Sequence, residues 1–176
     1  MAKSPEYISL PEPATSGEKS LEALLQQRRS VREYQEAALD LTTIGQLLWA
    51  AQGITDPQGY RTAPSAGALY PLELYVVAGN VGGLSPGVYH YHPDKHRLLQ
   101  TEAGDLRHVL ARAALAQPWV KKAAAVVVIT AVYDRTTRKY GDRGGRYVHM
   151  EVGHAAQNLF LQAEALGLAT LVVGAF

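Results

Sequence analysis

The run AAAVVVITAVY, at residues 123–133, is the feature that most constrains the fold. It is continuously apolar and rich in β-branched residues, without the alternation of a strand that has one wet face. Such a run is typical of a strand buried on both faces. Helices must then cover the sheet, and a chain of this size can bury roughly 70% of its unfolded surface. We therefore predict an α+β protein with one sheet and helices packed around it.

Hydrophobic periodicity and turn residues predict the other elements. Further strands are expected at 72–79, 87–93, 96–104 and 168–176, the second and third forming a hairpin around Asp94 and Lys95. Helices are expected at about 21–30, 41–53, 104–116 and 146–166, with Ser20 and Asp40 before the first two and Gly53 and Gly167 after the second and fourth. Residues 1–18 contain three prolines and predict an extended N-terminal arm. Residues 19–176 then form a single domain.

Composition and charge exclude several classes of protein. The net charge of +1 gives no basic field for nucleic acid. The absence of cysteine excludes a disulfide framework, a thiolate zinc site and a cysteine nucleophile. No run approaches the ~18 apolar residues of a membrane helix, and the polar, proline-broken N-terminus does not resemble a signal peptide. We expect a cytoplasmic protein that binds neither nucleic acid nor membrane.

Three arginines surround one serine in the stretch LLQQRRSVREY, residues 24–34. Arg28, Ser30 and Arg32 alternate, so an extended segment would direct them to one face. Two guanidinium groups and a hydroxyl suit one phosphate group, which arginine binds bidentately. The alternative is a solvated basic helix end that complements the helix dipole.

Two further stretches contain candidate site residues. The segment RTAPSAGALYPLELYVV, residues 61–77, has small residues that would let a flat ring lie close to backbone amides; the alternative is an ordinary turn before a strand. Lys139 and Tyr140 are adjacent in a polar segment before the long helix. On that helix Met150, His154, Gln157 and Leu161 share one face, where a polar group is more often a core or interface residue than a catalyst.

Together, in this order, these stretches resemble the nitroreductase-like family of FMN-dependent oxidoreductases. RRSVREY resembles the family's phosphate-binding signature, PSAGALYP its flavin-lining loop, and LGLATLVVGAF the strand and turn that close over the flavin. GVYHYHPDKHRL and KYGDRGGRYVHMEVGHAAQNL resemble the SagB-type dehydrogenase branch, which includes the azoline oxidases. The resemblance covers about residues 8–176.

The resemblance implies a set of site residues. The FMN phosphate would be held by Arg28, Arg29, Ser30 and Arg32. The other cofactor contacts would come from Pro64, Ser65, Ala66, Ala68, Gln157, Gly174 and Ala175. Ala68 stands where many relatives have asparagine, so one polar flavin contact would be missing.

Lys139 and Tyr140 match the pair that is essential in azoline oxidases and would remove a proton; the alternative is a surface lysine with a tyrosine packed behind it. A lysine base needs burial or nearby cations, and Arg135, Arg138 and Arg143 are close in sequence.

The resemblance also implies an architecture and a reaction. The fold would be a nitroreductase-like, central mixed, mostly antiparallel sheet flanked by helices, in an intertwined homodimer with the long helix in its core and the N-terminal arm around the partner. FMN would carry hydride at N5 in ping-pong fashion, with peptide azolines as substrates. The alternatives are an NAD(P)H-dependent reductase of nitro or quinone compounds, with NAD(P)H as a transient donor, and a non-catalytic flavin-binding scaffold subunit.

Two further expectations complete the prediction. Relatives continue past the position of Phe176 with another strand and a basic arm, so the C-terminal strand is expected to be missing here and FMN retention to be weaker. A metal site on His90, His92 and His96 is disfavoured, because tyrosines alternate with His90 and His92 and no carboxylate cluster accompanies them.

Overall fold

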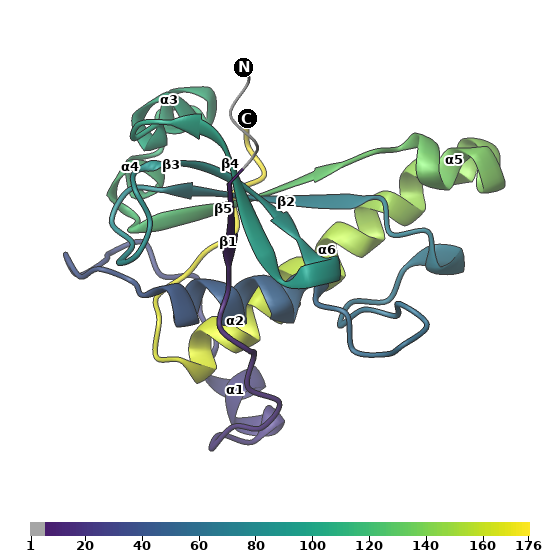
Figure 1. The fold of residues 1–176 in the computed structure, drawn as a ribbon, viewed down its shortest axis with the longest axis horizontal. Helices are drawn as coiled ribbons and strands as arrows, with labels where there is room; N and C mark the ends of the chain where they lie inside the picture. Colours follow the sequence, from purple (N-terminus) through teal and green to yellow (C-terminus); the bar gives the residue numbers. More distant parts are fainter. Residues whose placement is uncertain (1–5) are drawn as a thin grey trace.

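A five-stranded antiparallel sheet forms the centre of the computed structural model, which describes residues 6–176 (Figure 1). The strands are β1 Tyr7–Ser9, β2 Leu72–Ala78, β3 Gly87–His92, β4 Arg97–Ala103 and β5 Ala125–Ala131. Their order across the sheet is β1-β4-β3-β2-β5, and each neighbouring pair is antiparallel. An isolated parallel bridge joins Leu39 to Val81. The predicted α+β class and the mostly antiparallel sheet are therefore confirmed.

Six α-helices accompany the sheet. They are α1 Leu21–Gln27, α2 Leu41–Gln52, α3 Arg107–Ala113, α4 Pro118–Lys122, α5 Asp134–Tyr140 and α6 Gly144–Ala165. Short 3-10 turns cover Ala66–Ala68, Pro93–Lys95 and Gly141–Arg143. Among the described residues, none of the helices combines the length and the hydropathy that crossing a bilayer requires.

The helix boundaries follow from local capping. The Ser20 side chain accepts a hydrogen bond from the backbone N–H of Ala23, and Asp40 accepts one from Thr43. Each bond satisfies a backbone donor that the first helical turn leaves without a partner. Gly53 follows α2, as predicted.

The core lies between the sheet and the two longer helices, α2 and α6, which lie together on one side of it in Figure 1. Ile44 and Leu48 of α2 and Val148 of α6 are buried against Val76 of β2. The apolar stripe of each helix faces the sheet, which explains the amphipathic pattern of both helices. The opposite face of the sheet is only half-buried at Tyr75 and His90, whose rings stack with centroids 4.6 Å apart.

Strand β5 forms where it was predicted, but the prediction that both of its faces are buried is wrong. It lies at one edge of the sheet and pairs with β2 alone, and its residues are half-buried apart from the exposed Thr130. An apolar run reports which residues avoid water, but it does not report how many strands flank them. The single chain therefore presents an apolar strand edge.

The predicted strand at 168–176 is also wrong. These residues lie beyond α6 without strand pairing in the part of the chain that the structure describes. The Val31 N–H donates to the Thr170 carbonyl at 3.0 Å, and Val173 packs on the small cluster formed by α3 and α4. A β-branched sequence favours extended backbone, but a strand also needs a neighbouring strand to share its hydrogen bonds.

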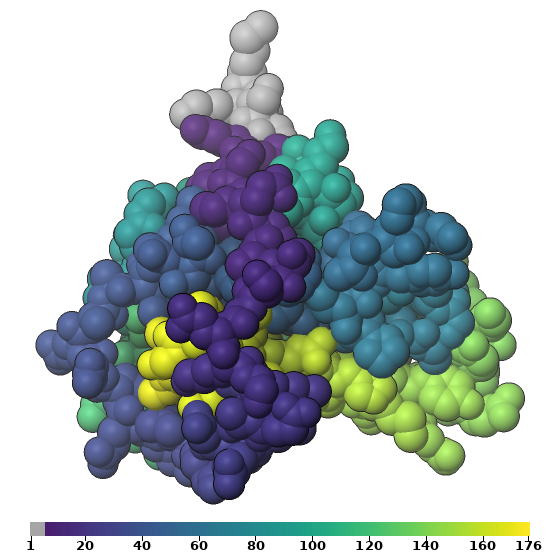
Figure 2. All heavy atoms as spheres, turned by 90° about the horizontal axis from the view of Figure 1, so that it is seen from below, coloured from purple at the N-terminus to yellow at the C-terminus, as the bar shows by residue number. Residues whose placement is uncertain are grey.

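The described part of the N-terminal arm packs on its own chain. Strand β1 pairs with β4, and Leu10 is buried in the core. Further along, Lys19 Nζ donates to the Glu164 carbonyl at 2.9 Å, so this segment crosses the end of α6 (Figure 2). Residues 1–5 of the predicted arm lie outside the described residues.

Candidate functional site

The Lys139–Tyr140 pair lies against the small-residue loop that was predicted to line a cofactor. Gly67, in the turn Ala66–Ala68, has φ of +66°. A Cβ atom at this glycine would lie 2.8 Å from Tyr140 Oη and 2.9 Å from Lys139 Nζ. The structure therefore brings together two predicted groups that are separated by more than 70 positions in sequence. Figure 1 shows this corner, where the loop before β2 approaches α5 and the start of α6.

Local hydrogen bonds fix the loop around Gly67, and packing on α6 fixes the end of α5. Ser65 Oγ accepts the backbone N–H of Tyr70 at 2.9 Å, and the Ala68 N–H donates to the Ser65 carbonyl at 3.1 Å. These bonds close the loop over Gly67. Helix α5 ends at Tyr140, whose ring meets the Tyr147 ring edge-to-face at 4.9 Å between centroids. The tyrosine hydroxyl is thus directed by packing on α6.

Lys139 is exposed, and two of the arginines expected around it lie beside carboxylates. Arg135 forms an ion pair with Glu73 of β2, and Arg138 lies 3.8 Å from Asp134 on its own helix. Each of these two arginines therefore has an acidic neighbour, which offsets part of the positive charge expected beside Lys139. The Lys139 ammonium lies 5.5 Å from the centroid of the Tyr140 ring.

A buried carboxylate, Glu151, lies beneath the same loop and was missed by sequence reasoning. It is 2% exposed, and its Oε1 has no hydrogen-bond partner among residues 6–176. Burial is the largest influence and raises the pKa of Glu151, while the Ser65 hydroxyl, Arg61 and His154 act in the opposite direction. One signal was present, since Glu151 interrupts the buried stripe of Val148 and Ala155 at spacings of three and four.

Changing Gly67 to alanine tests the close approach of Lys139 and Tyr140. The new methyl group must displace the ends of both side chains, and a non-glycine residue at this φ costs about 1–2 kcal/mol. We expect a modest loss of stability and, because groups misplaced by about 1 Å can cost 100-fold, a fall in turnover of that order. Gly59→Ala is the matched control, because Gly59 has φ of +87° but nothing within 4 Å of its Cβ position. Equal turnover in the two variants would contradict a role in activity for the close approach of Lys139 and Tyr140 to Gly67.

Changing Glu151 to glutamine tests its burial through the pH dependence of stability. A carboxyl group whose pKa is higher in the folded than in the unfolded state loses stabilisation as pH rises above the unfolded value of about 4.3. Glutamine does not ionise, so the variant should gain stability relative to the parent as the pH rises from 4 to 7. Denaturant titrations at both pH values measure this difference. The control Glu102→Gln removes the same charge from an exposed site on β4, and an equal gain there would contradict the interpretation.

The arginine cluster occupies a different part of the molecule. The Arg28 guanidinium lies over the Phe160 ring of α6 at 4.9 Å, and that of Arg32 over the Trp119 ring of α4 at 5.5 Å. Arg29 donates to the backbone carbonyls of Gln26 and Arg28. Ser30 is exposed. Among residues 6–176, none of these arginines forms an ion pair with a carboxylate, so their charge is available to an anion.

Along α6 the arginine cluster and the loop lie at different levels. Arg28 contacts Phe160, whereas Ser65 lies near Glu151, nine residues earlier on the same helix. Nine residues correspond to roughly 13 Å of helix. An open hollow of about 240 Å³, lined by Leu24 of α1 and Thr62 among others, lies along α6 between Asn158 and Ala165. Within one chain, the predicted phosphate-binding and ring-binding residues are therefore separate.

The remaining predicted contacts also lie apart from the loop. The carbonyl of Ala175 accepts from the Gln117 side chain at 3.3 Å, which places Ala175, and Gly174 next to it, near the start of α4. Gln157 is exposed on α6. The predicted helix face is mostly open to solvent, since Met150 is 52% exposed and His154 is exposed.

Two of the three hairpin histidines form hydrogen bonds within the protein. His90 Nε2 lies 2.7 Å from Glu73 Oε2, and His96 contacts the Tyr91 hydroxyl and the Pro11 carbonyl. No group of three metal-ligating side chains is found in the described range.

Comparison with known proteins identifies the family. The model of the nitroreductase family matches residues 25–176. A protein of Methanocaldococcus jannaschii whose name places it among the nitroreductases is 53% identical over 156 residues, covering 89% of this chain and 79% of the relative. The microcin B17-processing protein McbC of Escherichia coli is 30% identical over 136 residues, covering 74% of this chain and 50% of the relative.

Solved structures give the same result. A nitroreductase-named protein from Anabaena variabilis matches with a TM-score of 0.78 and 32% identity, over 92% of this chain and 34% of that one. The E. coli microcin synthetase McbBCD complex, with truncated pro-MccB17 bound, matches with a TM-score of 0.63 and 25% identity, over 88% of this chain and 62% of the matched chain. The chain thus spans about a third of the Anabaena protein and half of McbC. This protein belongs to the nitroreductase family.

Proposed function

We propose that this protein is an FMN-dependent oxidoreductase that transfers hydride at flavin N5 in two half-reactions, and that it dehydrogenates azoline rings in peptides. Family membership supports the oxidoreductase class. The single observation that carries the proposal is the convergence of Lys139 Nζ and Tyr140 Oη on Gly67. The likeness to McbC supports the peptide azoline class of substrate.

The residues present fit FMN. Three arginines without carboxylate partners in the described range supply the charge that a phosphate requires. The loop from Pro64 to Ala68 has side chains no larger than proline, so a flat ring could approach its backbone. We propose that Arg28, Arg29, Ser30 and Arg32 hold the phosphate and that Pro64, Ser65, Ala66 and Ala68 line the ring. When bound, FMN supplies the hydride chemistry.

The proton chemistry falls to Lys139 and Tyr140. Loss of two hydrogens from an azoline ring requires that a proton leave carbon while a hydride equivalent leaves the substrate. Lys139 Nζ would accept that proton, and Tyr140 Oη would donate a hydrogen bond to the ring heteroatom. The buried carboxyl of Glu151 lies beneath Ser65 and would help to fix the loop.

A homodimer would complete such a site, and the exposed face of α6 supports this proposal. Met150, His154 and Gln157 leave that face open in the single chain, although Met150 is large and apolar. We propose that in this dimer each FMN takes contacts from both subunits. The second subunit would then supply the FMN contacts that we predict for Gln157, Gly174 and Ala175.

A second candidate function is the NAD(P)H-dependent reduction of small nitro or quinone compounds. The relative from M. jannaschii favours it, since it is 53% identical and bears a nitroreductase name. In this case NAD(P)H would donate hydride and leave before the acceptor binds. A non-catalytic flavin-binding subunit is the remaining alternative.

The first test is the visible absorbance of the purified protein after loading with FMN and desalting. Flavin bands at about one per chain would support the cofactor assignment, and a colourless protein would contradict it. Turnover with NADH or NADPH and a quinone, and with a synthetic azoline peptide, then separates the two substrate classes. Bound flavin without turnover of either kind would favour the non-catalytic subunit.

A further inference from the structure

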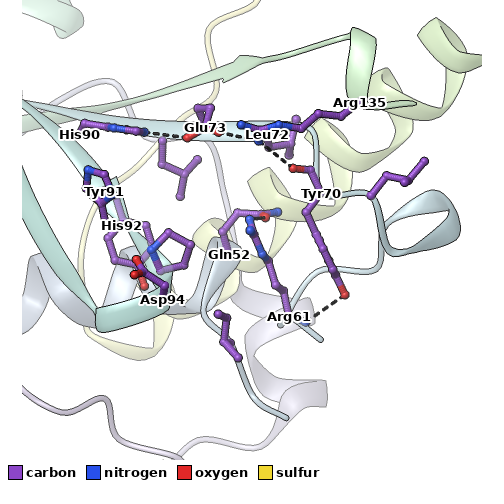
Figure 3. Close-up of a pocket in the computed structure, with 14 residues that line it drawn as sticks. Gln52, Arg61, Tyr70, Leu72, Glu73, His90, Tyr91, His92, Asp94 and Arg135 are labelled. Atoms are coloured by element: carbon purple, nitrogen blue, oxygen red, sulfur yellow. Dashed lines mark hydrogen bonds and ion pairs between the residues drawn. The ribbon is translucent and has the colours of Figure 1, made fainter. Parts of the chain in front are cut away.

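A second cavity, of about 560 Å³, lies beyond the loop from the Lys139–Tyr140 corner (Figure 3). It opens between the end of α2, the segment that follows it, the start of β2 and the end of β3. The lining residues that matter here are Gln52, Arg61, Tyr70, Glu73, His90 and His92. No residue predicted to bind FMN lines it.

Gln52 is a buried amide whose orientation is fixed. It is 1% exposed, and its Oε1 accepts a hydrogen bond from Arg61 Nη1 at 2.8 Å. A guanidinium group has only donors, so the atom that faces it must be the amide oxygen. The Nε2 group is therefore a donor that is itself shielded from solvent, and among residues 6–176 it has no acceptor. Buried amide donors are rarely left in this condition.

Arg61 and His92 each have a buried nitrogen atom without a hydrogen-bond partner among residues 6–176. Arg61 Nε is buried and has no acceptor in the described chain, while its guanidinium is held 4.5 Å above the Tyr70 ring. No carboxylate forms an ion pair with Arg61 within residues 6–176. His92 Nε2 is likewise buried without a partner there, and the ring is held against His90 with centroids 4.5 Å apart. Two donors of cavity-lining residues, Gln52 Nε2 and Arg61 Nε, thus lack acceptors among residues 6–176, and His92 Nε2 lacks a hydrogen-bond partner of either kind there.

The acidic group of the cavity does not satisfy these donors. Glu73 is already bonded to His90 Nε2 at 2.7 Å and ion-paired with Arg135, as the dashed lines in Figure 3 show. Asp94 lies at the opening and is exposed. The residues that line the cavity therefore include two buried donors without acceptors and one guanidinium group that forms no ion pair among residues 6–176, although Glu73 and Glu151 act on it at longer range.

We propose that this cavity binds a carboxylate group, held by Arg61 and Gln52, with His92 as a third contact. A carboxylate presents two oxygens with about four acceptor positions in one plane, and a charge that offsets the guanidinium. A small organic acid and the C-terminus of a peptide share this chemistry. The site uses none of the predicted flavin contacts, so it does not depend on the proposed function.

The test is a titration of the full chain, followed by the NMR signals of the Gln52 side-chain amide and the Arg61 Nε–H. Acetate should shift both signals in a saturable way, whereas the neutral isostere acetamide should not. An acetylated dipeptide with a free carboxyl terminus is compared with its C-terminal amide. Tighter binding of the free acid than of acetate identifies a peptide terminus, and equal binding identifies a small acid.

Two variants give the matched comparison. Gln52→Glu places a side-chain carboxylate of the protein itself beside Arg61. This carboxylate would pair with the Arg61 guanidinium and repel acetate, so acetate binding should weaken by about tenfold or more. Arg97→Lys is the control, since Arg97 also has a buried Nε without a described partner but does not line the cavity. It should leave the affinity unchanged. The proposal is overturned if acetate produces no saturable shift in the parent, if acetamide produces the same shift, or if the two variants bind equally.

Discussion

Replacing Arg28 and Arg32 together with alanine is expected to weaken FMN binding by about 10²–10⁴-fold. Each charge-assisted hydrogen bond to a phosphate contributes on the order of 1.5–3 kcal/mol, and the two changes remove both guanidinium groups. Neither arginine has a competing carboxylate in the described chain, so the whole charge is available to the ligand. Quenching of flavin fluorescence on titration measures the dissociation constant.

The control for this experiment must remove two positive charges elsewhere. Lys95→Ala with Arg112→Ala does so at exposed positions of the hairpin and of α3. Because Arg28 and Arg32 also stack on Phe160 and Trp119, thermal melting is needed to confirm that the test variant remains folded. The phosphate assignment is wrong if the folded test variant binds FMN as tightly as the control.

The second large effect is expected at the Lys139–Tyr140 pair. Lys139→Met and Tyr140→Phe should each lower the rate of the substrate half-reaction by about 10²–10⁴-fold, the usual contribution of general acid–base catalysis. Flavin content should not change, because neither residue belongs to the proposed phosphate site. Anaerobic stopped-flow reduction of the bound flavin by an azoline peptide isolates this half-reaction.

Arg138→Gln is the neighbouring control, since Arg138 is exposed on the same helix and does not contact Gly67. If Lys139→Met and Tyr140→Phe both reduce the flavin at the control rate, the pair is structural and the small-molecule reductase becomes the better proposal. A loss confined to Tyr140→Phe would assign the proton transfer to the phenol alone.

Much of the local structure could be predicted because its causes are local. The caps at Ser20 and Asp40 depend on residues three positions away, and the hairpin of β3 and β4 depends on the turn between them. The amphipathic period of the long helix gave α6 to within about two residues, which is the ordinary uncertainty of helix ends. The adjacent pair Lys139–Tyr140 and the loop PSAGA were recognisable as motifs in the same way.

The errors share one cause, which is dependence on distant neighbours. Whether β5 is central or at an edge depends on the number of strands that pair with it, and only β2 does so. Residues 168–176 have the composition of a strand but no strand beside them in the described chain. Residues 134–140 were expected only to be polar, yet they form α5, whose Arg135 pairs with Glu73 of β2.

The sequence by itself determined the family, the class of fold and most of the helices and strands, because caps, turns and hydrophobic periods act over a few residues. Only the tertiary structure decided that Lys139 and Tyr140 meet Gly67, that Glu151 is buried beneath Ser65, and that Gln52 and Arg61 share a cavity. Each of these depends on which distant surfaces pack together. Burial and the loss of hydrogen-bond partners arise from that packing, and no local pattern encodes them.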